Sequence, residues 1–258
     1  MNSRKIGVSI TGAAAIAALL LTIAPAYAQT VTSSTSSSGA NSASRLAAII
    51  TMANSDIALR ITSLNALNTR VQAMANESAA EKASISTQVQ TNITGLNALQ
   101  TKIDADTTPA TARTDAATIF TTFRIYALVI PQGWILASAD RVTTITGLLT
   151  TLGTKMQTRI TADQTAGDNV TALTSALTDM NAKIADANTQ SAAAQSGVSS
   201  LVPDQGNTSV AASNKAALVA AKTDIQTAST DLKAARADVT TILQGLKTLG
   251  APKSVTTN

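Results

Sequence analysis

Residues 215–249 read KAALVAAKTDIQTASTDLKAARADVTTILQGLKTL, and this stretch decides the fold class. An apolar residue recurs at every seventh position, and a second row, rich in alanine, follows the first at an offset of three residues. The first row is Leu218, Ile225, Leu232, Val239 and Leu246, and the second is Ala221, Ala228, Ala235, Ile242 and Leu249. A period of 3.5 residues keeps both rows on one helix face, so the stretch predicts a helix that supercoils against neighbouring helices.

The same spacing recurs through the rest of the chain, for example at Ile50, Ile57, Leu64 and Val71. It predicts one long N-terminal helix over residues 44–103. The apolar row of this helix weakens between Ala75 and Ser84, which indicates either a kink or a stretch without a partner. Further helices are expected over residues 109–123, 133–165, 169–200 and 209–249, separated by turn-forming Gly, Pro, Asp and Asn.

Together these helices predict an all-α fold over residues 44–250, followed by a tail at 251–258. Short connections near residues 167 and 205 place consecutive helices antiparallel, and alanine in one row permits close approach of the helix axes. We therefore expect an elongated antiparallel helical bundle with coiled-coil (heptad) packing.

The N-terminus carries the pattern of a secretory signal peptide over residues 1–28. Arg4 and Lys5 precede an apolar stretch over residues 6–24, and Ala26-Tyr27-Ala28 matches an A-x-A cleavage site. The alternative is a retained membrane anchor, which would want about 20 apolar residues. Residues 29–43 are rich in Ser and Thr and predict a disordered linker. Cleavage after Ala28 would export the chain to the periplasm, the cell surface or the extracellular space of a bacterium.

The composition excludes several classes of chemistry. The 258 residues include 50 Ala and 41 Thr but no Cys and no His, so disulfides, Cys/His metal sites, a His base and a Cys nucleophile are all excluded. Neither a G-x-S-x-G nor an S-x-x-K motif occurs, and the acidic residues mostly flank the apolar rows. We therefore predict no enzyme activity, no cofactor, no metal and no small-molecule substrate.

The charge balance also limits the partners. The formal net charge is +4, and removing Arg4 and Lys5 with the signal peptide leaves +2, which is too weak to indicate nucleic acid. No second apolar segment reaches membrane-spanning length by inspection, so no transmembrane segment is expected after cleavage. The partner classes that remain are another protein or a second copy of this chain.

The aromatic residues outside the signal segment fall within fifteen positions of each other. Phe120, Phe123, Arg124, Tyr126 and Trp134 form a candidate interaction cluster, because Trp, Tyr and Arg are enriched at binding hot spots. The alternative is a plug of large side chains that fills one end of the bundle. Helix and extended strand compete over residues 124–131, and because Pro131 disfavours helix at Ile130 we expect an extended crossing there.

The segment FRIYALVIPQGWILASADRV, residues 123–142, resembles one found in a group of uncharacterised exported helical proteins of bacteria. The stretches DMNAKIADA, PDQG and DLKAARAD resemble the same group, so the resemblance spans about residues 110–245. It implies a secreted helical domain and supplies no catalytic residue.

The sequence thus favours a non-enzymatic structural or protein-interaction protein of the cell envelope or surface. Self-association is one route, because the predicted first helix is longer than the later ones and part of its apolar row would lack an intrachain partner. Two alternatives are an envelope chaperone that holds unfolded exported chains in an apolar groove, and a cell-wall-binding module that uses the aromatic cluster.

Overall fold

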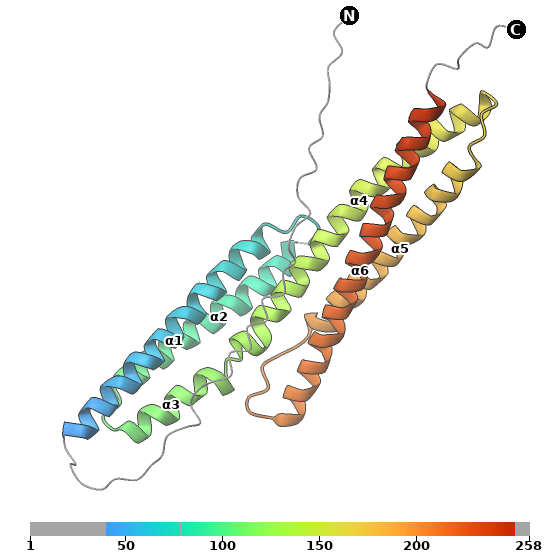
Figure 1. The fold of residues 1–258 in the computed structure, drawn as a ribbon. Helices are drawn as coiled ribbons and strands as arrows, with labels where there is room; N and C mark the ends of the chain where they lie inside the picture. Colours follow the sequence, from blue (N-terminus) through green and yellow to red (C-terminus); the bar gives the residue numbers. More distant parts are fainter. Residues whose placement is uncertain (1–39, 78, 251–258) are drawn as a thin grey trace, which may run out of the picture. The chain divides into compact units, whose positions relative to one another are not determined.

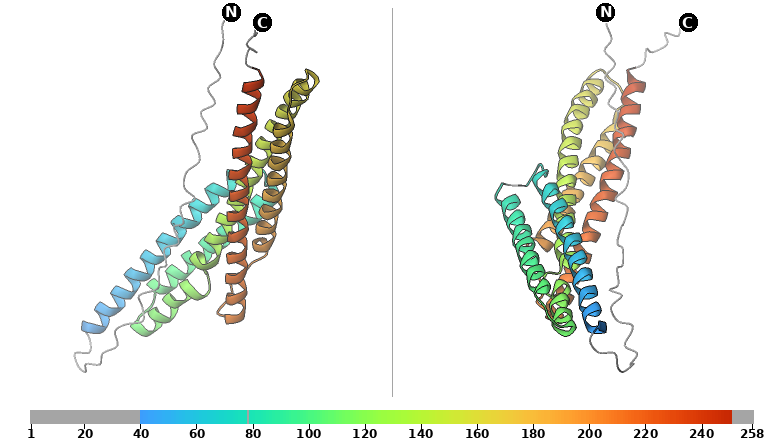
Figure 2. Two further views of the ribbon diagram at one scale, coloured as in Figure 1. Left: turned by 45° about the vertical axis from the view of Figure 1, so that its right-hand side comes forward. Right: turned by 90° about the vertical axis from the view of Figure 1, so that its left-hand side faces the viewer.

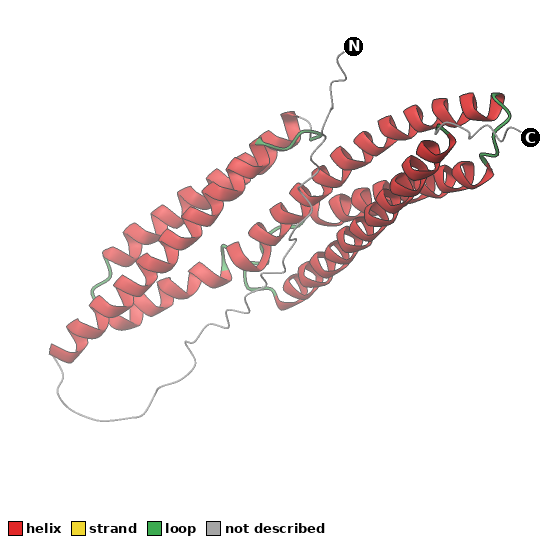
Figure 3. Cartoon of the chain, turned by 45° about the horizontal axis from the view of Figure 1, so that its top comes forward, coloured by secondary structure: helices red, strands yellow, loops and turns green. Residues whose placement is uncertain are grey.

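The computed structural model describes residues 40–250 except Ser78 (Figure 1). All of its regular elements are helical, and no strand occurs within this range (Figure 3), which confirms the all-α class. The predicted signal peptide, most of the predicted linker and the tail lie outside the described residues. In chain order the elements are α1 (Ala40–Gln72), α2 (Ala79–Asp104), α3 (Pro109–Thr121), the π-helix η1 (Ile125–Val129), α4 (Ile130–Thr165), α5 (Thr171–Ser199) and α6 (Thr208–Leu249).

The prediction of one long helix over residues 44–103 is wrong. The chain turns back after Gln72, and α2 lies beside α1 (Figure 2). Gln72 Nε2 donates to Ser86 Oγ at 2.6 Å near the turn, and Asn54 Nδ2 donates to Asp104 Oδ1 at 2.7 Å towards the other end. The apolar row of α1 therefore has an intrachain partner, so it is not left unpaired for self-association. The last four residues of the predicted linker also belong to α1.

The extended crossing expected over residues 124–131 is also wrong. Arg124 takes a left-handed backbone conformation, with φ of 50°, and ends the α3 segment. One π-helical turn follows and continues directly into α4, whose first turn holds Pro131. Pro131 has no N–H to donate, so it removes one backbone hydrogen bond at the junction of η1 and α4, where the pattern changes from π-helix to α-helix.

The helices predicted over residues 169–200 and 209–249 are confirmed to within two residues by α5 and α6. Asn207 caps α6 by accepting hydrogen bonds from the N–H groups of Ser209 and Val210. Every residue of the two apolar rows of α6 is buried or half-buried. Lys183 of α5 lies 3.9 Å from Asp231, whereas Leu173, nearer the start of α5, contacts Gly245 near the end of α6, so these two helices run in opposite directions.

Two apolar clusters form the core of the described region. The first lies among α1, α2, α3, η1 and the adjoining ends of α4, α5 and α6, and the second lies among α4, α5 and α6 alone. Between them, Ser191 Oγ donates to the Ala139 carbonyl at 3.0 Å, and Thr146 Oγ1 donates to Asn188 Oδ1 at 2.7 Å. Ser191 and Thr146 are each 2% exposed. Because buried polar groups must keep their partners, this layer fixes the register of α5 against α4.

Threonine is compatible with these helices because its hydroxyl bonds back to the helix itself. Thr62 Oγ1 donates to the Ala58 carbonyl at 2.9 Å, and Thr151 Oγ1 donates to the Gly147 carbonyl at 3.0 Å, each four residues earlier. The same i to i−4 bond recurs in every α-helix of the described region, for example at Thr91, Thr121, Thr189 and Thr223. These hydroxyls are thus satisfied locally, so the exposed threonine side chains add neutral groups to the surface.

Candidate functional site

The two phenylalanines of the predicted cluster belong to the core. Phe120, near the end of α3, and Phe123 are half-buried and pack against the first apolar cluster. A methyl group added to Gly95 of α2 would lie only 2.6 Å from Phe123 Cε1, so the ring fits directly against the α2 backbone. These side chains fill space where α1, α2 and α3 meet.

Arg60 of α1 joins Phe120 to Tyr126. Its guanidinium carbon lies 4.6 Å from the centre of the Phe120 ring and 5.0 Å from the centre of the Tyr126 ring. Arg60 is 6% exposed and is held by Asp56, through the backbone oxygen at 2.9 Å and the carboxylate at 3.3 Å. Cation–π contacts are stronger when the cation is desolvated, so Arg60 fixes the orientation of both rings.

Tyr126 and Trp134 remain at the surface, with exposed fractions of 42% and 47%. The Tyr126 hydroxyl lies 3.1 Å from Ser63 Oγ, and the Arg70 guanidinium carbon lies 3.8 Å from the centre of the Trp134 ring. Both aromatic side chains therefore lie against α1. Arg60, Ser63 and Arg70 were missed by the sequence reasoning; the only signal was that Asp56, Arg60 and Arg70 are the only charged residues between Leu46 and Asn76.

Arg124, the remaining residue of the candidate cluster, pairs with a loop residue and does not contact α1 through any interaction described for Tyr126 and Trp134. Its Nε and Nη2 atoms bond to the carboxylate of Asp204 at 2.6 and 3.1 Å, and Asp204 also accepts the Gly206 N–H at 2.8 Å. The Arg124 guanidinium holds the pKa of the Asp204 carboxyl below its ordinary value. Because this bidentate pair ties the loop between α5 and α6 to the start of η1, Arg124 has a structural role.

A second polar assembly anchors the turn between α1 and α2. The Asp140 carboxylate of α4 accepts hydrogen bonds from the N–H groups of Ala75 and Asn76 at 3.1 and 2.6 Å, and Asn76 Nδ2 donates to the Asp140 carbonyl at 2.9 Å. Gln195 Nε2 of α5 donates to Glu77 Oε1 at 2.8 Å. The turn is thus bonded to two other helices, which explains why the chain reverses where no Gly or Pro is present.

Glu77 is the strongly perturbed acid of this assembly. Burial, together with the neighbouring Glu81 and Asp140 carboxyls, raises the pKa of Glu77 to about 7, and Lys82 opposes the shift. A carboxyl whose pKa is raised on folding stabilises the folded state below its unfolded pKa, and this contribution is lost as the pH rises through the folded pKa.

We therefore expect the protein to be less stable at pH 8 than at pH 5. For Glu77 the difference is about 1 kcal/mol after allowance for solvent screening of this partly exposed group. Urea unfolding at the two pH values measures it, and Glu77→Gln should reduce the difference. Asp238, whose pKa is raised by burial and by Asp179, contributes with the same sign. An unchanged difference in Glu77→Gln would contradict this assignment, and Asp186→Asn, at an exposed acid, is the control.

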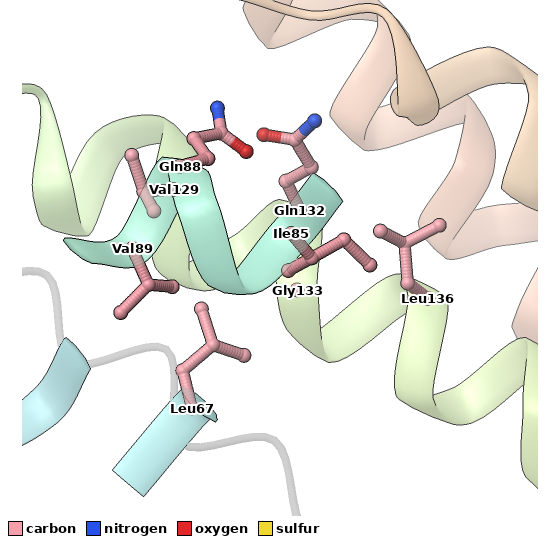
Figure 4. A pocket seen from close by; sticks show the side chains of 8 residues that line it. All are labelled: Leu67, Ile85, Gln88, Val89, Val129, Gln132, Gly133 and Leu136. Atoms are coloured by element: carbon pink, nitrogen blue, oxygen red, sulfur yellow. The ribbon is translucent and has the colours of Figure 1, made fainter. Parts of the chain in front are cut away.

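Gly133, next to Trp134 in the chain, lines a small cavity in the core. A cavity of about 10 Å³ lies between α1, α2 and the start of α4 (Figure 4). Gln132 at its edge is 4% exposed and donates through Nε2 to the Val198 carbonyl at 2.7 Å, while its Oε1 accepts no hydrogen bond from the described residues. The volume matches about one water molecule, so this cavity is part of the packed core and has no room for an organic ligand.

One helical stretch of the described region, Pro109–Thr165, is long and apolar enough to cross a membrane by length and composition. Its 18-residue window has a mean hydropathy of 1.3, and 44% of that window is buried within the protein. This finding corrects the expectation that no second apolar segment reaches spanning length. Core helices of soluble proteins meet the same criteria, so the stretch is weak evidence for a membrane span.

Among residues 40–77 and 79–250, no group of three or more His, Cys, Asp or Glu side chains is arranged to hold a metal ion. Comparisons of the chain with family models, curated proteins and solved structures find no match. Function is therefore inferred from the chain's own residues.

Proposed function

We propose that this chain is an exported, non-enzymatic protein of the cell envelope or cell surface that acts as a structural or protein-interaction module. The observation that carries the proposal is the pair of exposed aromatic residues, Tyr126 and Trp134, each held against α1 by a hydroxyl or a guanidinium. Rigid exposed Trp and Tyr bury large area at small entropic cost when a partner binds.

We further infer that the helices form an elongated antiparallel bundle with heptad packing. The buried rows of α6 and the opposite directions of α5 and α6 support this. Small residues at these positions also support it, since Ala187, Ala228 and Ala235 are fully buried where α5 and α6 meet. Small-angle X-ray scattering tests the elongation, because a compact particle of this mass would give a much smaller maximum dimension.

Export is proposed from the sequence pattern of residues 1–28 and from the resemblance to exported helical proteins. Expression of the full chain in a bacterium, followed by mass spectrometry of the periplasmic and extracellular fractions, tests it. The expected product begins at Gln29. An intact chain in the membrane fraction would instead support the retained anchor.

The interaction role predicts that Trp134→Ala abolishes capture of a specific envelope protein. The experiment is affinity capture from an envelope extract of the source organism with the mature chain as bait. The control is Leu148→Ala, which removes another exposed side chain of α4, 67% exposed. If Trp134→Ala and Leu148→Ala reduce capture equally, the aromatic residues have no specific role in binding. Far-UV circular dichroism spectra equal to that of the unchanged chain show that both variants fold.

The cell-wall-binding alternative rests on the same two exposed aromatic residues, since sugar rings also stack on Trp and Tyr. If the protein cosediments with isolated cell wall and Trp134→Ala abolishes this binding, the cell-wall-binding alternative is favoured.

The chaperone hypothesis requires an exposed apolar groove. Neither the 10 Å³ core cavity nor the open surface depression on α2, which is lined by Ser86, Thr87, Gln90, Thr91 and Thr94, is such a groove.

A further inference from the structure

The outward face of α1 carries a second row of residues with heptad spacing. Met52, Leu59, Ser63 and Arg70 all lie within roughly 60° of one direction around the helix axis, given 3.6 residues per turn. Met52 and Leu59 are 51% and 57% exposed, although the inward rows of the same helix are buried. The two apolar residues of this row, Met52 and Leu59, are thus left mostly uncovered by the described residues.

The two exposed aromatic side chains extend this row sideways. Tyr126 meets it at Ser63, and Trp134 meets it at Arg70. We call the combined surface the outer α1 strip, and it consists of Met52, Leu59, Ser63, Arg70, Tyr126 and Trp134. From Met52 to Arg70 it is about 27 Å long at 1.5 Å per residue, which matches a partner helix of about 18 residues.

Arg70 supplies the charge of the strip. Its guanidinium stacks on Trp134 and makes no hydrogen bond or ion pair with any described residue. Arg60, by contrast, is neutralised by Asp56 beneath the strip. A guanidinium stacked on an indole keeps its in-plane N–H donors free and oriented, which favours bidentate binding of a carboxylate.

We propose that the outer α1 strip binds an amphipathic helix that carries an acidic residue. Apolar side chains of that helix contact Met52, Leu59 and the Tyr126 ring, and its carboxylate pairs with Arg70. Because Arg70 follows Leu59 by eleven residues, the acid lies about eleven residues from the apolar residue that contacts Leu59. A single free cation is too little charge for an anionic membrane surface, which requires several basic residues.

This inference rests on the proposed interaction function and can fail separately from it. The probe is a synthetic 22-residue amphipathic helix with leucine at heptad spacing and one glutamate eleven residues from a leucine. Trp134 is the chain's only tryptophan, so its fluorescence reports binding at the strip itself. We expect saturable binding, with a change in the Trp134 emission.

The variants test the charge and the apolar contact separately. Arg70→Gln should weaken binding about tenfold or more, as expected for loss of a charge-assisted hydrogen bond. Leu59→Gln should weaken it as well, while Arg113→Gln, at an exposed arginine of α3, should leave it unchanged within about twofold. A probe with glutamine in place of glutamate should bind as weakly to the unchanged chain as to Arg70→Gln, since the two losses remove one interaction.

Three results would overturn the proposal. They are an unchanged emission with millimolar probe, equal binding of the glutamate and glutamine probes, and binding only to phosphatidylglycerol vesicles. If sedimentation shows a dimer that Leu59→Gln dissociates, the occupant is a second copy of this chain and the proposal is wrong. Should the probe fail while Trp134→Ala still abolishes envelope capture, the interaction function stands and only the acidic helix is rejected.

Discussion

Replacing Asp140 with alanine is expected to lower the free energy of unfolding by about 3 kcal/mol, because it leaves the N–H groups of Ala75 and Asn76 without their charged acceptor. Asp140 is 8% exposed, so water cannot fully replace the carboxylate. Thermal unfolding measures the effect, and roughly 2–4 °C per kcal/mol predicts a decrease in Tm of about 6–12 °C.

The effect should be local as well as global. Hydrogen exchange at the amides of Ala75 and Asn76 should accelerate in Asp140→Ala more than exchange in α5 and α6, because the anchored turn is released first. Asp186→Ala, at an exposed acid of α5, should change the stability by less than about 0.5 kcal/mol. Equal losses in the two variants would show that Asp140 does not anchor the turn.

Replacing Gly133 with alanine is expected to destabilise the protein by about 1–2 kcal/mol, although alanine is the better helix former. A Cβ atom at this position would lie 2.3 and 2.7 Å from the two methyl carbons of Leu67 and 3.0 Å from its Cγ. The whole isobutyl group of Leu67 would have to move, so α1 would be pushed from α4.

Gly147 of the same helix is the matched control, since no side chain and no backbone beyond its own helical turn lies within 4 Å of a Cβ built there. Gly147→Ala should therefore stabilise the protein by about 0.5–1 kcal/mol, so the two substitutions differ in sign. Urea unfolding of both variants measures this difference. In a Leu67→Ala background the penalty of Gly133→Ala should disappear. A Gly133→Ala variant as stable as Gly147→Ala would mean that the helices separate freely.

The parts of the fold that local patterns control were predictable. The turn-forming residues 202–207 and the heptad rows of residues 215–249 together predicted α6 to within one residue. Gly167 and Gly206, both with positive φ, mark the turns that end α4 and precede α6. The aromatic residues were correctly identified as a departure from the pattern. It was not predictable that Arg124 and Trp134, both of the candidate cluster, would have different partners. Arg124 pairs with Asp204, eighty residues away, and Trp134 stacks with Arg70 of α1.

The sequence by itself determined that this chain is helical, that it is rich in threonine and poor in charged residues, and that it lacks the side chains for Cys or His chemistry. Only the tertiary structure decided where the first helix ends and what lies on the outer face of α1. The reason is that heptad periodicity is a local property of one helix, and its weakening after Ala75 is equally compatible with a kink, an unpartnered stretch or a reversal of the chain. The reversal depends on the Asp140 carboxylate from α4, and the exposure of Met52 and Leu59 depends on which face of α1 the folded-back α2 covers.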